Sequence, residues 1–157
     1  MGVDVRLAVE EDVGSIAARG IRLVDRIEAN ALGRGEDIEA AIHEGFGNSD
    51  CYVICDDDGP FVIGGITDNR DNPSIGIPWF ISTDDITRHR FSFARIVRRL
   101  MDEADLKYDK MEQRMWVGND KARAFAEAVG FSFDDENLSN MSGLDFVYFS
   151  RNKPGRA

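Results

Sequence analysis

The chain has 157 residues, a length that suits one domain with a buried core of its own. Its formal net charge of −10 argues against direct nucleic-acid binding, because contact with phosphates needs net or local positive charge. No apolar run approaches the roughly 18 residues of a membrane-spanning helix, and Met1–Glu10 lacks the layout of a signal peptide. We therefore expect one globular domain over residues 1–150, made in a cytoplasm without membrane contact, and a loose tail over 151–157.

The first half of the chain predicts a strand, a broken helical segment, a second helix and a hairpin. Glu10, Glu11 and Asp12 place negative charge where a helix start favours it, and Gly14 and Gly20 weaken the helix that follows. The elements are expected at Val3–Ala8 (strand), Glu10 to about residue 30 (helix), Glu36–Glu44 (helix), and Cys51–Cys55 with Phe61–Thr67 (hairpin strands).

The second half alternates strands with helices. The elements are expected at Ser74–Ser82 (strand), Thr87–Tyr108 (the longest helix), Met115–Val117 (strand), Lys121–Val129 (helix), and Phe131–Phe133 with Leu144–Ser150 (an antiparallel pair). Strands mixed with helices in this order predict an α/β fold, in which a mixed sheet carries helices on both faces.

Cys51 and Cys55 are the only cysteines. On one strand they point to the same face about 13 Å apart, at roughly 3.3 Å per residue. A disulfide needs Cα atoms within about 7 Å, and no second His/Cys cluster accompanies the pair as a metal site would require. We expect two small apolar core residues with free thiols, and no metal.

The segment Met115–Phe133, MWVGNDKARAFAEAVGFSF, carries the most specific signal of the chain. Asn119, Ala122, Gly130 and Phe131 stand at relative positions 0, +3, +11 and +12. This spacing resembles the signature that closes the acyl-CoA site of the GNAT N-acetyltransferases, and the opening VRLAVEEDVGSIA is similar to the start of many members. The resemblance implies a sheet of about six or seven strands, splayed between the fourth and the fifth.

The resemblance also implies a cofactor and its contacts. Acetyl-CoA would lie in the splay, with its pyrophosphate at the helix start after the fourth strand, where free N–H groups bind anions. Arginine suits phosphate through bidentate, permanently charged contacts. The cofactor-binding residues implied are Phe80, Ile81, Ser82 and Thr83 on the pantetheine, Arg88 and Arg90 on the phosphates, and Asn119 and Phe125. The arginines can instead form an exposed basic helix face, and Asn119 can serve only as a helix cap.

Three departures from the family pattern bear on catalysis. Ser82–Phe93 has no glycine where active members use glycines to bring the backbone close to the phosphates. Ala126 stands where many members carry the tyrosine that protonates the leaving thiolate, and Ser74–Ile81 has no glutamate to act as base. His89 is the candidate catalytic base by residue type, since its reference pKa lies near neutrality; it can equally be a surface helix residue.

A narrower resemblance links the chain to GNAT-like proteins of short-tailed bacteriophages, some of them internal virion proteins. Trp79–Thr83, Tyr108, Met115–Asn119 and Gly130–Phe133 carry it. It implies a host-cytoplasmic or virion-interior location. Three functions stay open: transfer of acetyl from acetyl-CoA to an amine on a small molecule or protein of host or phage; a catalytically degenerate virion or ejection protein that contacts other virion proteins; and an acidic inhibitor of a host enzyme.

Overall fold

The computed structural model describes residues 2–33 and 37–154. The elements follow in the order β1 (Asp4–Leu7), α1 (Glu10–Arg19), α2 (Leu23–Ala31), α3 (Ile38–Asn48), β2 (Ser49–Asp56), β3 (Gly59–Asp68), β4 (Ile75–Ser82), the 3₁₀ turn η1 (Asp84–Ile86), α4 (Arg90–Ala104), β5 (Lys110–Trp116), α5 (Asp120–Ala128), β6 (Ser132–Met141) and β7 (Leu144–Asn152).

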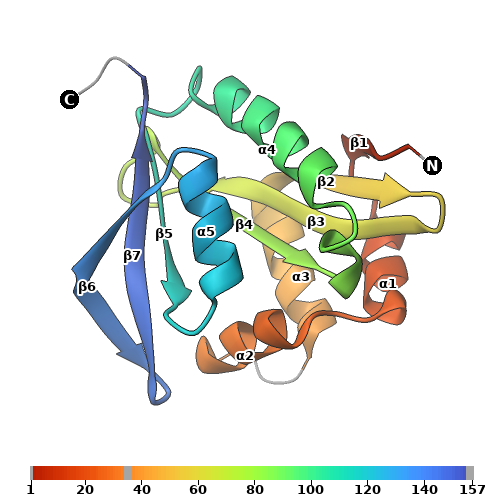
Figure 1. Ribbon diagram of the computed structural model, residues 1–157, viewed down its shortest axis with the longest axis horizontal. Helices are drawn as coiled ribbons and strands as arrows, with labels where there is room; N and C mark the ends of the chain where they lie inside the picture. Colours follow the sequence, from red (N-terminus) through yellow and green to blue (C-terminus); the bar gives the residue numbers. More distant parts are fainter. Residues whose placement is uncertain (1, 34–36, 155–157) are drawn as a thin grey trace.

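Within the described residues, seven strands form one sheet in the order β1-β2-β3-β4-β5-β7-β6. Neighbouring strands are antiparallel except β4 and β5, which run parallel. That parallel pairing is confined to Ile75 opposite Lys110 and Gly76 opposite Met111, after which the two strands diverge. The sheet is therefore splayed in its middle, between the fourth and fifth strands (Figure 1).

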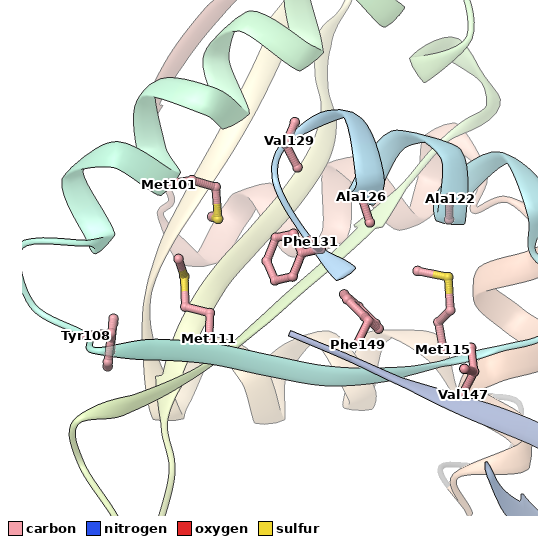
Figure 2. Close-up of a cluster of buried hydrophobic side chains, with 10 residues drawn as sticks. All are labelled: Met101, Tyr108, Met111, Met115, Ala122, Ala126, Val129, Phe131, Val147 and Phe149. Carbon is pink, nitrogen blue, oxygen red and sulfur yellow. The ribbon is translucent and has the colours of Figure 1, made fainter. Parts of the chain in front are cut away.

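Helices cover both faces of the sheet (Figure 1). One buried cluster joins α1, α2 and α3 to β2 and β3, with Ile16, Ile42 and Ile63 fully enclosed. On the opposite face, α4 and α5 pack on β5 and β7 through the side chains drawn in Figure 2. The α/β fold class expected from the sequence, with a mixed splayed sheet of about seven strands, is confirmed.

Two glycines end helices where the chain must take a positive φ. Gly20 has φ of 109° and stops α1, so the break expected in the helical segment to residue 30 is confirmed and the segment forms two helices. Gly130 has φ of 99° and turns the chain from α5 into β6, while its neighbour Phe131 is buried.

Several boundaries differ from those expected. The helix over Thr87–Tyr108 is shorter, because Asp84–Ile86 forms a 3₁₀ turn and α4 begins only at Arg90. β5 begins five residues before Met115, and β6 extends to Met141 although its sequence is mostly polar. β6 is an edge strand with largely exposed side chains, so its register depends on hydrogen bonds to β7 and not on an apolar pattern.

The C-terminal ends of α3 and β7 also differ from those expected. α3 runs from Ile38 to Asn48, four residues beyond Glu44, whereas the expected start at Glu36 lies outside the described residues. β7 continues through Asn152, two residues into the segment expected to be a tail. Arg151 is held there by its hydrogen bonds to the Val129 carbonyl (2.6 Å) and to Asp105 (2.7 Å).

Candidate functional site

The divergence of β4 and β5 opens a cleft of about 1200 Å³ that reaches both faces of the sheet. Its walls come from α2 and α3 on one face and from α4 and α5 on the other. Phe80, Ile81, Asn119 and Phe125, four of the residues expected to bind a cofactor, line it. Ser82, Thr83, Arg88, Arg90 and His89 are not among the described residues that line it.

Gln113 of β5 spans the splay with its side chain. Its Nε2 donates to the Pro78 carbonyl of β4 (3.0 Å), and its Oε1 accepts from the Arg114 backbone N–H (2.9 Å). Because buried backbone groups need partners, this amide stands in for hydrogen bonds that the sheet ladder loses where the strands separate. Sequence reasoning did not single out Gln113, since nothing local marks a strand glutamine as a bridge.

Three aromatic rings form the wall of the cleft beside α4 and α5. Phe93 and Phe125 stack with ring centroids 4.7 Å apart, and Phe80 meets Phe93 at 5.4 Å. Arg22, the residue before α2, lies over the Phe80 ring at 5.5 Å from its centroid. The rings make a dry, rigid surface of the kind that a thioether or alkyl chain of a ligand packs against.

Ser82 and Thr83 lie at the end of β4 in full burial. The Ser82 backbone N–H donates to Asp25 Oδ2 (2.9 Å), and its carbonyl accepts from the Arg22 N–H (3.0 Å). Its hydroxyl is the one buried side-chain polar atom in the described residues that has no hydrogen-bond partner. Thr83 caps η1 by accepting from the Asp85 N–H (3.3 Å).

The turn after β4 uses its own backbone amides. They donate to carbonyls within the turn: Ile86 to Thr83 (3.4 Å), Thr87 to Asp84 (3.2 Å) and Arg88 to Asp85 (3.0 Å). An anion site at a helix start needs amides that point outward without a partner. The turn from Thr83 to Arg88 therefore offers an anion fewer amides than a glycine loop would.

The side chains after the turn join an ion-pair cluster around Asp56, at the end of β2. Arg19 of α1 contacts Asp56 at 2.7 Å and Asp85 at 2.9 Å; Arg88 contacts the same two carboxylates at 3.1 and 3.3 Å. His89 Nε2 lies 3.0 Å from Asp56 Oδ2. The Arg19 guanidinium holds the pKa of Asp56 well below its usual range.

His89 and Arg90 are placed differently from each other. The His89 ring packs on Phe61 with centroids 4.8 Å apart, so it is partly buried at the start of α4 and faces away from the cleft wall. Arg90 is exposed and lies over the ring of Phe91, which is itself exposed. The structure thus keeps His89 with Asp56 and leaves Arg90 accessible to solvent.

Asn119 joins α5 to α2. Its Oδ1 accepts from the Ala122 N–H (3.4 Å), which is the helix-cap role, and its Nδ2 donates to Glu28 Oε1 (3.0 Å). Asn119 is 6% exposed. Asn119 is therefore a helix cap that also holds a carboxylate at the edge of the cleft.

Helix α2 crosses the open end of the splay and touches both diverging strands (Figure 1). At the β4 end, Arg22 and Asp25 form a two-point ion pair that also binds Ser82. At the other end, Glu28 accepts from Asn119 and lies beside Trp116 at the end of β5. Sequence reasoning missed these three polar residues, although their spacing of three places them on one face of a helix.

Burial raises the pKa of both carboxylates on α2. It raises the pKa of Glu28, the hydrogen bond from Asn119 opposes that shift, and the charge of Asp25 adds to it. Burial likewise raises the pKa of Asp25, against the opposing effect of the Arg22 guanidinium. Both side chains line the cleft, so titratable carboxyl groups with perturbed pKa values meet its open end.

Two other residues named from the sequence also line the cleft, Ala126 and Tyr108. Ala126 is buried among the side chains of Figure 2. The hydroxyl of Tyr108 donates to Asp68 at the end of β3. Cys51 is buried, with its Sγ 3.8 Å from the Gly45 carbonyl, and it forms no disulfide with Cys55, whose pKa is raised by burial.

Two further findings concern the described part of the chain. None of its helices is long and apolar enough to cross a membrane. It contains no group of three or more His, Cys, Asp or Glu side chains arranged to hold a metal ion.

No protein-family model and no curated protein sequence matches the chain. Solved structures of acetyltransferases do match it over nearly its whole length. The complex of AAC(6′)-Ib with paromomycin and acetyl-CoA matches with a TM-score of 0.70 at 14% identity, covering 100% of this chain and 99% of that one. A chimera of Vibrio cholerae spermidine N-acetyltransferase SpeG and hSSAT matches with a TM-score of 0.69 at 15% identity, covering 98% and 96%.

A GNAT-family acetyltransferase from Streptococcus pneumoniae matches with a TM-score of 0.66 at 11% identity, covering 96% of this chain and 99% of that one. Identities this low carry the backbone arrangement and not the chemistry of the site. The chain therefore has the fold of the GNAT N-acetyltransferases.

Proposed function

We propose that the protein is an N-acyltransferase that moves the acetyl group of acetyl-CoA to an amine. The observation that carries this proposal is the cleft of about 1200 Å³ that opens where β4 and β5 separate. A pocket of that size with an apolar wall and a few convergent polar groups suits a long cofactor arm. AAC(6′)-Ib, which shares the fold, was solved with acetyl-CoA and with coenzyme A.

The lining of the cleft supports this assignment. Phe80, Ile81 and Phe125 provide the apolar surface for the pantetheine arm, and Asn119 stands at the β5–α5 junction. Arg88, in the turn before α4, and Arg90, the first residue of α4, are both exposed and would contact the phosphates from the solvent side. The acceptor amine belongs to a small molecule or a protein, and it enters at the side of α2 and α3.

We expect this protein to turn over more slowly than a typical enzyme. Ala126 cannot protonate a leaving thiolate, and general acid help typically supplies about 10²–10⁴-fold. We expect a kcat below the common range of about 1–10³ per second. Thiol release followed with a chromogenic reagent across polyamines, aminoglycosides and lysine peptides measures it.

A second candidate is a GNAT-fold protein without catalysis, which acts through its surface as an internal virion or ejection protein of a phage. The turn between Thr83 and Arg88 favours it, because that turn satisfies its amides internally and places Asp84 and Asp85 where phosphate would approach. The phage origin rests on the sequence resemblance alone.

Calorimetric titration with acetyl-CoA and with coenzyme A separates the two candidates. The acyltransferase proposal expects one site per chain with a Kd in the range of about 1 µM to 1 mM, as for enzyme substrates. Ile77→Trp places a large ring in the cleft and should abolish the heat, whereas Leu106→Trp adds the same ring at an exposed position and should not. Absence of binding to the wild-type protein would reject the proposal in favour of the surface role.

A further inference from the structure

Glu28 occupies a distinctive position at the junction of three elements. It projects from α2 into the cleft, where its Oε1 accepts from Asn119 Nδ2 at 3.0 Å. Trp116 lies beside it at the end of β5, at a point where β5 has already left its parallel partner. The hydrogen bond from Asn119, at the start of α5, therefore holds the carboxylate at the open end of the splay.

We propose that Glu28 is the proton acceptor of the transfer reaction, the role for which the fourth strand offers no glutamate. This inference rests on the proposed acyltransferase function and assigns the group that makes the amine nucleophilic. The carboxylate would bind the incoming ammonium and take one of its protons. A base must lie within hydrogen-bond reach of the proton that it removes, and a carboxylate in the wall of the cleft meets this condition.

The hydrogen bond from Asn119 leaves Glu28 free to accept another. A carboxylate has about four lone-pair sites. Asn119 fills one of them with a neutral donor, and no cation forms an ion pair with Glu28 among the described residues. Asp25, one turn earlier, is instead committed to the guanidinium of Arg22 and to the Ser82 N–H, with its side chain 5% exposed.

The surrounding charges suit a base that works near neutral pH. Asp25, on the same helix, disfavours the ionised form, and Arg22, the residue before that helix, favours it. From α5 and β5, Asn119 presents a neutral amide and Trp116 its backbone N–H. Burial is the largest influence and moves the pKa of Glu28 upward, toward the working pH. A base is most effective when its pKa lies close to that pH.

The step balances without a further reactant. Glu28 takes one proton from the ammonium, and the freed nitrogen forms a C–N bond to the thioester carbonyl carbon. As the C–S bond breaks, the electron pair stays on sulfur, and the second proton of the nitrogen ends on that thiolate. Glu28 releases its proton to solvent, so one acetylated amine, one thiol and one proton result.

Glu28→Gln tests the assignment, because it keeps the shape and the acceptor oxygen for Asn119 but removes the base. Thiol release is measured from pH 5.5 to 9.5 with acetyl-CoA and the best acceptor among spermidine, paromomycin and a lysine peptide. We expect kcat/KM at pH 7.5 to fall at least about 100-fold, within the usual range for general-base help. The affinity for acetyl-CoA in calorimetry should stay within threefold of wild type.

The pH profile distinguishes a base from a structural residue. Wild-type kcat/KM should rise and then level above the pKa of Glu28, whereas the variant should keep rising tenfold per pH unit toward the pKa of the amine. Trifluoroethylamine, whose nitrogen is largely unprotonated at neutral pH, should narrow the gap between the two proteins. Glu39→Gln, an exposed carboxylate on α3, is the matched control and should leave every value unchanged.

Each other outcome has a definite meaning. A variant within threefold of wild type, with the same profile, overturns the role of Glu28 and leaves the acyltransferase function standing. Acetyl-CoA binding without thiol release to any of the three amines overturns the role of Glu28 as well. Failure of the wild-type protein to bind acetyl-CoA rejects the proposed function itself. If Glu28→Gln melts at a lower temperature, Glu28→Asp, which retains the carboxylate, must recover the levelling profile.

Discussion

Two groups of carboxylates near the cleft have opposite kinds of partner. At the turn before α4, which we call the first end, Asp56 and Asp85 are each paired with two guanidiniums, those of Arg19 and Arg88. Where α2 crosses the diverging strands, which we call the second end, Glu28 accepts a hydrogen bond from the neutral amide of Asn119. The carboxylates of the first end are neutralised by ion pairs within the protein, whereas Glu28 at the second forms no ion pair among the described residues.

This difference separates stabilising groups from groups available to a ligand. A carboxylate paired with guanidiniums is stabilised as an ion, so Asp56 fastens α1 and the start of α4 to the β2–β3 hairpin. A carboxylate that is desolvated and unpaired is destabilised as an ion, which is the usual state of a catalytic acid or base. We therefore expect mutations at the first end to act on stability and mutations at the second to act on chemistry.

The largest expected stability effect is that of Asp56→Asn. It removes the charge that pairs with Arg19, whose side chain is 16% exposed, and breaking a largely buried ion pair leaves an uncompensated charge. Because Asp85 and the Gly59 carbonyl still accept from Arg19, we expect a loss of about 2–3 kcal/mol in the free energy of unfolding. Chemical denaturation measures it.

Asp58→Asn is the control for that variant, since it removes one charge from an exposed side chain in the same turn. It should change stability by no more than about 0.5 kcal/mol. Equal effects of the two substitutions would show that net charge, and not the pairing of Asp56, governs stability at this end.

The pH dependence of stability should differ in sign between the two ends. The pKa of Asp56 is lowered by folding, so its contribution is present above the unfolded value of about 3.9 and is lost as pH falls through the folded one. The pKa of Glu28 is raised, so its contribution is present below about 4.3 and is lost as pH rises through the folded value.

Denaturant unfolding from pH 3 to 8 resolves the two contributions. Asp56→Asn should flatten the loss of stability on the acid side, and Glu28→Gln should remove the loss that begins above about pH 4.3. The Glu28→Gln protein would then be as stable as wild type at pH 7 or more so. A marked destabilisation at that pH would show that Glu28 also stabilises the packing of α2, and the pH profile of Glu28→Asp would then decide its part in the chemistry.

The sequence signals that proved reliable were those set by local chemistry. Gly20 and Gly130 mark helix ends because each takes a positive φ, and the spacing from Asn119 to Phe131 anticipated the α5–β6 junction. The fold class followed from such signals. The extent of β6 was not predicted, because an edge strand paired on one side carries no apolar alternation. Its pairing with β7 is a long-range property.

The candidate site was only partly accessible from the sequence for the same reason. Phe80 and Phe125 were expected in the cleft from the resemblance to the GNAT family, and both line it. Glu28 resembles a solvent-facing residue of an amphipathic helix, and its burial depends on α2 crossing two strand ends that are distant in the chain. His89 matched a base by residue type, but the turn before α4 directs it to Asp56.

Substitution of Arg88 and Arg90 tests whether the first end, whose charges form ion pairs within the protein, also binds a ligand. If acetyl-CoA binds, the double substitution by alanine should weaken it at least tenfold and reduce its salt dependence, because charge-assisted hydrogen bonds contribute about 1.5–3 kcal/mol each. Arg95→Ala with Arg99→Ala removes two exposed charges further along α4 and is the matched control. Equal affinities in calorimetry for the two double variants would assign Arg88 wholly to Asp56 and Asp85.

The smallest expected effect is that of Gln113→Ala, which concerns the junction between the two ends. Its amide joins the Pro78 carbonyl of β4 to the Arg114 N–H of β5, at 3.0 and 2.9 Å. Without it, both backbone groups lie beside the cleft, where water can replace the lost partner, so we expect a loss of about 1 kcal/mol in stability. Gln113→Glu keeps the acceptor for Arg114 but loses the donor to Pro78, and its stability should fall between those of the alanine variant and the wild type.

Hydrogen exchange at the Arg114 amide reports the same contact directly: it should quicken in the alanine variant and stay slow in the glutamate variant. If exchange is unchanged in both, the ladder and not Gln113 keeps β4 and β5 at their separation.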